Sequence, residues 1–350
     1  MSNHTFAVYG ASGFQGILVL AELARRNLTP VLVGRDAGKL KAAAAQAGMP
    51  DADLRVATLD DHTALVAAFQ DADVVINCAG PFTSTGDRVI AAALAAGSHY
   101  TDTCGEQPFL QHVYETYPAA AESAGVTIVP AATDGGIPGD LLAHLLGERL
   151  GPLAELTSIH RFGGETAMSR GSLRTMLGIA DAMTDGGLAY LDNAWRPGPF
   201  DPPAPVTLPG AAEPVAVAPF PLQEPVSVPR HVSVRTVRGM VEDSTRALFA
   251  TPLTNEMIES LPVGPNDAQR AAGTWTIVLD AVAESGRRAR GVISGPDTYG
   301  TTARTAVEAA ARLATTPASA GVLAPAQAFD PADFLAALAP FGVHWTIEDH

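Results

Sequence analysis

Three glycines near the start of the chain are spaced three residues apart. They lie in the run Gly10-Ala11-Ser12-Gly13-Phe14-Gln15-Gly16, between an apolar segment typical of a strand and a segment rich in Leu and Ala that predicts a helix. In such a loop the first glycine permits a tight turn, the second lets the backbone approach a pyrophosphate, and the third lets helix and strand pack closely. Free amides at the start of the helix then hold the phosphates. The run predicts a dinucleotide site formed by Gly10, Ser12, Gly13, Phe14, Gln15 and Gly16.

The end of the second apolar segment distinguishes between the two nicotinamide cofactors. It reads Val33-Gly34-Arg35-Asp36. An acidic residue here binds the ribose hydroxyls of NAD, whereas an arginine pairs with the 2′-phosphate of NADP. Because Asp36 is also placed to cap the helix that begins near Gly38, Arg35 favours NADP, with Lys39 as a second phosphate contact. The alternative gives Asp36 the ribose role and favours NAD.

Three further segments follow predicted strands, where a doubly wound sheet forms its cofactor crevice. Asp60 follows the third strand and is placed to approach the adenine. The fourth strand ends in the run 77–82, which would present backbone to a nicotinamide. The run 99–106 comes next and is unusually polar for a strand end. The cofactor contacts expected in the run 77–82 are Cys78, Ala79, Gly80 and Pro81.

The first third of the chain alternates short apolar runs with helical segments. The predicted strands are 6–9, 30–33, 54–59, 74–78 and 126–130. The predicted helices are 14–26, 38–46, 62–69 and 88–96. Strict alternation of strand and helix predicts an α/β fold with a doubly wound parallel sheet, a Rossmann domain over residues 1–130.

A second domain is predicted over residues 131–295. The segments 155–163, 232–237, 275–283 and 287–294 have the alternating pattern of a half-exposed sheet, with a hairpin turn at 284–286. They predict an α+β domain with a mostly antiparallel mixed sheet, for substrate binding or oligomerisation. Residues 296–350, with helices at 299–313 and 331–338 and a closing run at 343–347, are expected to return to the Rossmann domain.

Between the first two strands of this second sheet lie a predicted helix, 169–183, and a proline-rich segment. The segment 197–229 holds 11 of the chain's 27 prolines, so we expect it to be stiff, extended and on the surface. Two positions remain open for it. It either borders the substrate site or wraps the far side of the molecule.

Composition excludes several classes of protein. The 37 acidic residues outnumber the 22 Lys and Arg, so the net charge of −15 repels nucleic acid and anionic membranes. No apolar run approaches the ~18 to 20 residues that span a bilayer. The only two cysteines fit a reducing compartment, and no leader precedes the first strand, so we expect a cytoplasmic protein. We expect a small-molecule substrate and no nucleic-acid or membrane partner, and the sequence leaves a homodimer open.

Several catalytic mechanisms are excluded by missing residues. The only lysines are Lys39 and Lys41, which removes Schiff-base chemistry, a Walker lysine and a Tyr-x-x-x-Lys pair later in the chain. Neither a Gly-x-Ser-x-Gly nor a His-Glu-x-x-His motif occurs, so hydrolase and metalloprotease functions are disfavoured. Cys104 with His99 and His112 has no standard metal-site spacing, and no metal is predicted.

Taken together, the motifs resemble the saccharopine dehydrogenase-like oxidoreductases, most closely the actinobacterial branch that includes trans-acting enoyl reductases. The resemblance rests on the runs 8–14, 34–35, 77–82 and 99–106, and continues more loosely at 133–140, 169–172, 295–300 and 321–326. It implies an NADP-dependent reductase of a C=N or an activated C=C bond, with an α/β substrate domain inserted after the Rossmann domain. Gln15 stands where a threonine is usual.

The proton that follows a hydride transfer has five candidate donors in the sequence. Each of them also has an ordinary structural use, such as closing a turn, and water could serve instead. His160 and Arg161 lie on a predicted strand and so on opposite faces, and a surface position is the more common one for such a histidine. The candidates are Tyr100, Asp102, Asp134, His160 and Tyr299. The rival to the reductase is a non-catalytic NADP-binding sensor.

Overall fold

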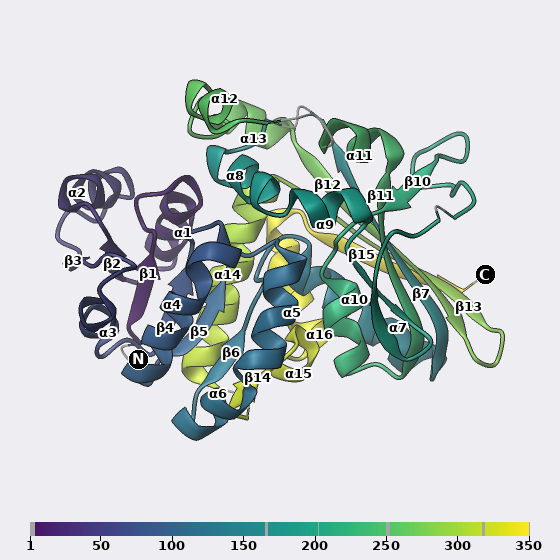
Figure 1. Ribbon diagram of the computed structural model, residues 1–350, viewed down its shortest axis with the longest axis horizontal. Helices are drawn as coiled ribbons and strands as arrows, with labels where there is room; N and C mark the ends of the chain where they lie inside the picture. The colour runs from purple at the N-terminus through teal and green to yellow at the C-terminus, as the bar shows by residue number, and fades with distance from the viewer. Residues whose placement is uncertain (1–3, 165–166, 202, 250–252, 317–318, 350) are drawn as a thin grey trace.

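The computed structural model describes residues 4–164, 167–201, 203–249, 253–316 and 319–349, which form two β-sheets (Figure 1). In these ranges the first sheet has seven parallel strands in the order β14-β6-β5-β4-β1-β2-β3. Because the strand order reverses between β1 and β4, the topology is doubly wound, as predicted. Its strands are β1 (Phe6–Tyr9), β2 (Val31–Gly34), β3 (Leu54–Val56), β4 (Val74–Asn77), β5 (His99–Asp102), β6 (Thr127–Val129) and β14 (Gly321–Val322).

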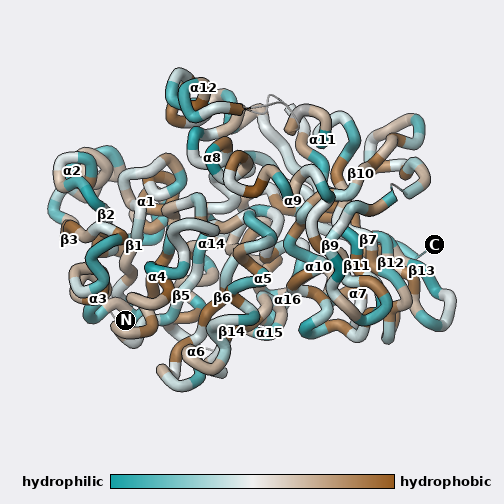
Figure 2. Tube along the Cα trace, in the orientation of Figure 1, coloured by the Kyte–Doolittle hydropathy of each residue, from teal (hydrophilic) through white to brown (hydrophobic). Residues whose placement is uncertain are grey.

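Helices cover both faces of this sheet, which explains why its central strands are apolar throughout. On β1, Phe6 and Val8 pack with the core that contains Val307, whereas Ala7 and Tyr9 pack with Phe69 on the opposite face. The outer helices alternate polar and apolar positions along their length (Figure 2). The helices of this domain are α1 (Phe14–Arg25), α2 (Ala37–Gln46), α3 (His62–Phe69), α4 (Phe82–Ala96), α5 (Gln107–Thr116) and α6 (Pro118–Ala124).

The second sheet is mixed and mostly antiparallel, which confirms the predicted α+β character of the second domain. Its order is β15-β13-β12-β7-β11-β8-β9, with β10 paired to β11, and the pair β7 and β11 is parallel. The strands are β7 (Leu153–Gly163), β8 (Leu188–Leu191), β9 (Ala194–Pro197), β10 (Val217–Pro219), β11 (Val234–Glu242), β12 (Thr274–Ala283), β13 (Arg288–Pro296) and β15 (His344–Asp349).

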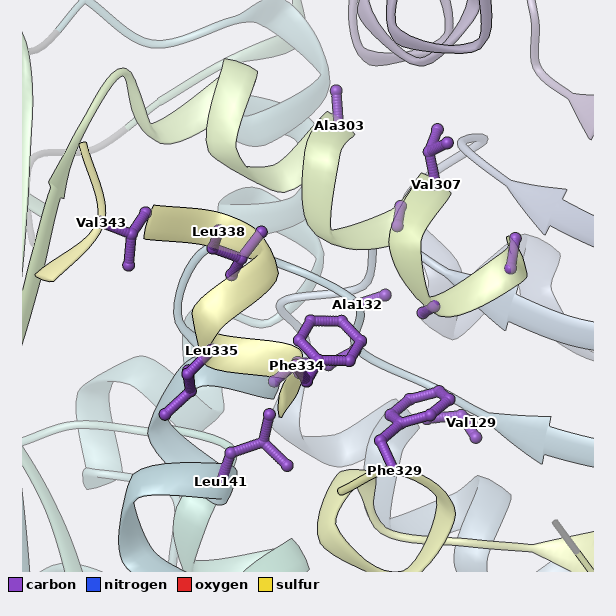
Figure 3. Packing of buried hydrophobic residues seen from close by; sticks show 14 of the residues in the cluster. Val129, Ala132, Leu141, Ala303, Val307, Phe329, Phe334, Leu335, Leu338 and Val343 are labelled. Carbon is purple, nitrogen blue, oxygen red and sulfur yellow. The ribbon is translucent and has the colours of Figure 1, made fainter. Parts of the chain in front are cut away.

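One apolar core joins the two sheets. α14 (Thr298–Thr315) packs on α1, β4 and β5, while α7 (Gly136–Leu150) packs on β12, β13 and α16 (Pro331–Leu338). Figure 3 shows Phe334 of α16 among Val307 of α14, Leu141 of α7 and Val129 of β6. The two domains are therefore held by shared packing and not by a linker.

Three sequence predictions differ from the structure. The helix predicted at 169–183 is divided at Ile179 into α8 (Arg170–Gly178) and α9 (Ala180–Asp185). The helix predicted at 88–96 begins earlier, at Phe82, because the Glu106 carboxylate accepts hydrogen bonds from its first amides. The segment 296–350 returns to the first sheet through α14 and β14, but its last strand, β15, pairs with β13 of the second sheet.

The proline-rich segment is also not confined to the surface. Its part after residue 216 is buried and contains β10 and α10 (Glu224–Ser227). Val217, Leu222, Val226 and Val228 are each at most 5% exposed, and their apolar side chains draw the segment against the second sheet. The remaining short elements are α11 (Asp243–Phe249), α12 (Asn255–Ser260), α13 (Asp267–Ala272), α15 (Pro325–Ala328) and the 3-10 turns Val228–Arg230 and Ala339–Phe341.

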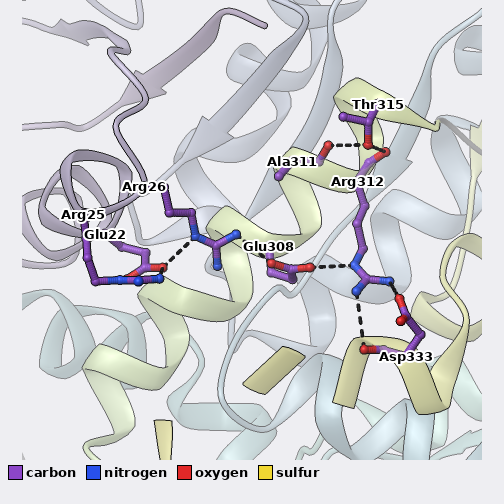
Figure 4. Close-up of polar contacts among 8 residues, drawn as sticks. All are labelled: Glu22, Arg25, Arg26, Glu308, Ala311, Arg312, Thr315 and Asp333. Carbon is purple, nitrogen blue, oxygen red and sulfur yellow. Dashed lines mark hydrogen bonds and ion pairs between the residues drawn. The ribbon is translucent and has the colours of Figure 1, made fainter. Parts of the chain in front are cut away.

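A chain of ion pairs links α1, α14 and α16 along the outside of this core (Figure 4). Arg26 of α1 lies 2.6 Å from Glu308 of α14, and the same carboxylate lies 2.8 Å from Arg312. Arg312 in turn pairs with Asp333 of α16 at 2.7 Å. Burial would raise the pKa of Glu308, but hydrogen bonds from Arg26 and Arg312 outweigh it and hold that pKa below its usual range.

We expect Glu308→Gln to lower the free energy of unfolding by about 1–3 kcal/mol, because two partly buried guanidinium groups lose the carboxylate that they share. Since the folded pKa is lowered, this contribution is present above the pH at which an unfolded glutamate titrates and is lost as the pH falls through the folded pKa. Urea unfolding of both proteins from neutral to acidic pH measures the difference. The control Glu155→Gln removes an exposed pair with Arg238 and should cost under about 1 kcal/mol; an equal cost in both variants would contradict the prediction.

Candidate functional site

The glycine loop after β1 has the geometry that its spacing predicts. Gly10 has a φ of 76°, and a Cβ there would lie 2.9 Å from the Cβ of Ala79 in the loop after β4. The Gly13 amide donates to the Gly10 carbonyl at 2.9 Å. A Cβ on Gly16 would overlap that same carbonyl oxygen. The loop therefore closes tightly at the point where the strand order reverses.

The amino end of α1 is open for an anion. Its N-cap, Gly13, is exposed and has no side chain, so none caps the first turn. First-turn amides have no carbonyl partner within a helix, and the helix dipole adds positive potential. Ser12 and Phe14 flank this position, and both are half-buried. The arrangement fits a pyrophosphate held by backbone amides.

Arg35 and Asp36 at the end of β2 have separate roles. The Asp36 side chain caps α2 by accepting a hydrogen bond from the Lys39 amide at 3.0 Å, as the capping argument predicts. Arg35 is exposed beside Tyr9 and forms no ion pair with any side chain in the described ranges. Its guanidinium is available for a phosphate, and the Lys39 side chain lies exposed in the first turn of α2.

Asp60 lies in the loop between β3 and α3. Its exposed carboxylate pairs with Arg88 of α4 at 2.9 Å. Both residues line a shallow surface groove of about 540 Å³ that also includes His62 and Tyr117. The adenine contact expected for Asp60 stays a prediction.

The carboxyl ends of β4, β5 and β6 face the second domain through glycines. A Cβ on Gly80 would lie 3.3 Å from Oγ1 of Thr175 in α8, and one on Gly105 would lie 3.8 Å from Nε2 of Gln223. A Cβ on Gly135 would lie 2.9 Å from Cε1 of His160. Three neighbouring strand ends therefore each lack a side chain where the second domain presents a polar one.

Thr175, Gln223 and His160 form a polar wall opposite these strand ends. Glu106 connects this wall to the loop after β4. Its carboxylate accepts hydrogen bonds from the amides of Phe82 at 2.6 Å and Thr83 at 2.7 Å, and from the Thr175 hydroxyl at 3.0 Å. One buried carboxylate thus holds both the start of α4 and the helix α8. The 78–81 loop, which contains Cys78, Ala79, Gly80 and Pro81, is fixed between them.

His160 is buried, so the surface position favoured by the sequence argument is wrong. Its Nε2 lies 2.7 Å from Oε1 of Glu224 in α10, with 6% and 0% of the two side chains exposed. The face of β7 that carries His160 is covered by α10 and by the segment before α7, since Glu224 and Gly135 lie against the ring. Arg161 points to the other face, where it pairs with Glu242 at 2.6 Å.

Tyr100 and Asp102 on β5 are fully buried beneath the crevice. The Tyr100 hydroxyl accepts a hydrogen bond from Asn77 at 3.1 Å, and burial together with the charge of Asp102 raises its pKa well above its usual value. Asp102 accepts from the amides of Cys104 at 3.0 Å and Ala131 at 2.8 Å. Burial raises the pKa of Asp102 to about 6, although these amides oppose the shift.

The thiol of Cys78 has its pKa raised to about 12, chiefly by burial, and burial likewise raises the pKa of the Cys104 thiol well above its usual range. Both side chains are therefore neutral thiols and poor nucleophiles. In the described ranges, His, Cys, Asp and Glu side chains form no group of three that could hold a metal ion.

Asp134 forms a hydrogen bond with α14, whereas the Tyr299 hydroxyl forms hydrogen bonds with the start of α8. Asp134 accepts a hydrogen bond from the Thr302 hydroxyl at 3.0 Å, and burial raises its pKa to about 6. The Tyr299 hydroxyl accepts from the Ser169 amide at 2.8 Å and lies 2.9 Å from the Ser172 hydroxyl, at the start of α8.

Tyr299 also touches the dinucleotide loop. The Phe14 ring packs edge-on against the Tyr299 ring at 5.1 Å, and the Gln15 side chain donates to the Tyr299 carbonyl at 3.1 Å. Tyr299 thus connects the cofactor loop to the start of α8, the helix that carries Thr175. A glutamine in place of the usual threonine has a structural use here.

Sequence reasoning missed four residues of this wall. Glu106 is the last residue of the polar run 99–106. A glutamate so close to the end of a predicted strand is the signal that could have found it. Thr175 lies in a predicted helix with no distinguishing pattern. Gln223 and Glu224 lie inside the proline-rich segment, where nothing in the sequence marks them.

Comparisons with known proteins agree with this geometry. The model of the saccharopine dehydrogenase NADP binding domain matches residues 6–129. A trans-acting enoyl reductase of Mycobacterium ulcerans is 33% identical over 177 residues, which are 48% of this chain and 42% of the relative. A saccharopine dehydrogenase-like oxidoreductase of Bos taurus is 32% identical over 150 residues, 38% of this chain and 35% of the relative.

A lipid droplet localized protein of Caenorhabditis elegans is 30% identical over 200 residues, 53% of this chain and 47% of the relative. The matched region therefore spans less than half the length of each of these curated relatives. The apo saccharopine dehydrogenase (L-Glu forming) of Saccharomyces cerevisiae superposes with a TM-score of 0.64 at 14% identity, over 99% of this chain and 100% of that one. This likeness shows a common fold.

No helix in the described ranges combines the length and the apolar character needed to cross a bilayer. The glycine loop, the exposed Arg35 and the family match together confirm NADP as the cofactor. Residues 6–129 match the saccharopine dehydrogenase NADP binding domain, and over 38–53% of its length the chain is similar to trans-acting enoyl reductases, a lipid droplet localized protein and a saccharopine dehydrogenase-like oxidoreductase.

Proposed function

We propose that this protein is an NADPH-dependent reductase of a C=N or an activated C=C bond in a small metabolite. The observation that supports this most is the wall formed by Thr175, Gln223 and His160 opposite the strand-end glycines. In a doubly wound sheet the nicotinamide end of the cofactor lies beside these strand ends. Polar groups from a second domain are therefore available at the place where a substrate would meet the cofactor.

The chain's own residues fit NADP in three places. The backbone at Gly10 and Gly13 and the open first turn of α1 would hold the pyrophosphate, and Arg35 with Lys39 would hold the 2′-phosphate. The 78–81 loop would contact the nicotinamide. When bound, NADPH supplies a hydride to the substrate, and the protein orients the two and excludes water.

Similar proteins support both bond types. A C=C bond is in keeping with the trans-acting enoyl reductases, and a C=N bond is in keeping with the saccharopine dehydrogenase-like proteins. The rival function, a non-catalytic NADP sensor, would have a crevice filled by the protein's own side chains. The wall has this feature, because His160 is 5% and Gln223 8% exposed. A substrate must therefore open this wall, or the protein binds NADP without turnover.

We further propose that the protein acts in the cytoplasm. Neither cysteine forms a disulfide, which fits a reducing compartment. The net charge of −15 favours a small-molecule substrate over nucleic acid or an anionic membrane. A homodimer is the assembly that we propose to test first, by light scattering of the full chain.

Oxidation of NADPH with 2-methyl-1-pyrroline, a cyclic imine, and with crotonyl-coenzyme A, an enoyl thioester, tests the enzyme against the sensor. We expect steady oxidation with at least one of the two and none without substrate. Gly13→Val, which we expect to lose NADPH binding, is the control. Any NADPH oxidation that this variant retains does not depend on the cofactor site. Tight NADPH binding with no turnover of either compound, or of wider imine and enoyl panels, would favour the sensor.

We expect the protein to bind NADPH more tightly than NADH by about ten- to a hundred-fold, and Arg35→Ala to erase the preference. A charge-assisted pair with the 2′-phosphate contributes about 1.5–3 kcal/mol, which corresponds to that ratio. Titration of both cofactors by fluorescence measures it. Lys41→Ala, an exposed change in the same helix α2, should leave the ratio unaltered. Equal affinities in the unmodified protein would refute the role of Arg35.

We expect Gly13→Val and Gly16→Val to fail in different ways. Gly13 has an extended backbone, φ −79° and ψ 167°, which valine adopts readily, so this variant should fold and lose NADPH binding. At Gly16 the added Cβ would overlap the Gly10 carbonyl, so that variant should also melt at a lower temperature. Calorimetric titration and thermal melts separate the two. Normal NADPH binding by Gly13→Val would make the loop a purely structural turn.

A further inference from the structure

Reduction of a double bond takes a hydride at one end and a proton at the other, and the structure separates the candidate proton donors. Tyr100 and Asp102 are both 0% exposed, beneath the crevice. The Tyr299 hydroxyl is engaged with Ser169 and Ser172 of α8. Asp134 accepts the Thr302 hydroxyl. Asp102 also has a carboxylate oxygen without a hydrogen-bond partner among the described residues, but its side chain is completely covered. His160 is 5% exposed and has an unpaired ring nitrogen beside Gly135, in the segment after β6.

The two nitrogens of His160 have different surroundings. Nε2 lies 2.7 Å from Oε1 of Glu224. Nδ1 has no hydrogen-bond partner in the described ranges, and it lies on the ring edge that faces Gly135, where a Cβ would lie 3.3 Å from Nδ1 and 2.9 Å from Cε1. The missing side chain at Gly135 thus allows the imidazole to lie against this backbone segment, with no side chain of residue 135 over the unpaired nitrogen.

This pairing determines where the imidazole holds its proton. An ionised carboxylate only accepts hydrogen bonds, so the Nε2 that faces Glu224 must carry a hydrogen. The neutral ring then has its lone pair on Nδ1, and the protonated ring has a donor at Nδ1. The charged groups that face His160 are Glu224 from α10 and Asp134 from the segment before α7. Both are acidic, so no positive charge competes for this position.

A second buried histidine shows that the free nitrogen is particular to His160. His231 lies 2.9 Å from Asp140, with 4% and 0% of their side chains exposed, which matches the burial of the first pair. Its Nδ1, however, lies 3.0 Å from Nδ1 of His144. Both nitrogens of His231 are therefore engaged, and it serves as an internal reference for a structural histidine.

One carboxylate oxygen of Glu224 has no hydrogen-bond partner among the described residues. This atom, Oε2, is buried, and the side chain is 0% exposed. A buried polar atom without a partner costs free energy. The carboxylate is held there by α10, which packs against α7, β8 and β11.

We propose that His160 donates the proton that completes the reduction, from Nδ1, and that Glu224 is the positioning residue that holds the ring in the required tautomer. The inference rests on the proposed function. The hydride forms a new C–H bond at one end of the C=N or C=C bond. The electron pair of that bond takes the Nδ1 proton at the other end, His160 becomes neutral with its Nε2 proton retained, and solvent restores the Nδ1 proton.

The tautomer is measurable without any substrate. Long-range nitrogen–proton spectra of the full chain labelled at histidine, with NADP bound and without it, report which ring nitrogen carries hydrogen, and His160→Gln identifies the signal. We expect Nε2 to carry hydrogen with NADP bound and without it, because it faces the Glu224 carboxylate, and Nδ1 to be the nitrogen without hydrogen in the neutral ring. Glu224→Gln should remove this preference. A neutral ring protonated on Nδ1 would overturn the proposal.

Turnover of 2-methyl-1-pyrroline or crotonyl-coenzyme A gives the second measurement. We expect His160→Gln to lower kcat by about 10²- to 10⁴-fold with NADPH affinity unchanged, to flatten the pH profile, and to recover in part with added imidazole. His231→Gln, the matched buried histidine, should leave the pH profile unchanged. Retention of the wild-type kcat and pH profile by His160→Gln would refute the donor role.

Two glycines give a finer pair of variants. Gly135→Ala places a methyl group against the imidazole of His160 and should lower kcat, whereas Gly273→Ala makes an ordinary contact at 3.4 Å with the Arg270 carbonyl, touches none of the wall residues and should not. Equal effects of the two would contradict the geometry. If the wild-type protein reduces neither compound, the proposed function fails, and the tautomer measurement alone decides whether His160 presents a proton at Nδ1.

Discussion

The shared apolar core between the two sheets is the constraint on which the rest of the structure depends. α14 lies on β4 and β5, and α7 and α16 fill the space toward the second sheet. Close-packed interiors transmit position from one element to the next, so the second sheet cannot move away from the strand ends without opening this core. The crevice is therefore bounded by two rigid sheets, and only α8 and α10 approach it as short, separate elements.

Glycine at the strand ends follows from this closeness. Gly80, Gly105 and Gly135 lie in the loops after three adjacent strands. At Gly80 and Gly135 a polar side chain of the second domain lies within 3.3 Å of the place that a Cβ would take, whereas at Gly105 the contact would be an ordinary one at 3.8 Å. The ring of contacts continues from Tyr299 through α8 to Glu106 and the 78–81 loop, which meets Gly10 again. The cofactor loop and the substrate wall thus share a continuous set of contacts.

Local pattern was enough to predict the Rossmann domain because its strands are buried on both faces and its turns need particular residues. Gly10 with its positive φ and Asp36 as a helix cap are requirements of the backbone itself. The position of His160 was not predictable in the same way. Whether a residue on a strand is covered depends on which elements pack on its face of the sheet. His160 is covered by α10 and by the Gly135 segment, and α10 lies 64 residues further along the chain in the proline-rich segment.

The proline-rich segment shows how composition can mislead about burial. Prolines restrict the unfolded chain, so ordering a long excursion loses less entropy than its length suggests. Because that cost is reduced, the apolar side chains at Leu222 and Val226 can hold a helix of one turn deep against the second sheet. Glu224 reaches His160 only through this packing. A segment that reads as a surface loop therefore supplies the carboxylate that fixes the one histidine of the crevice wall.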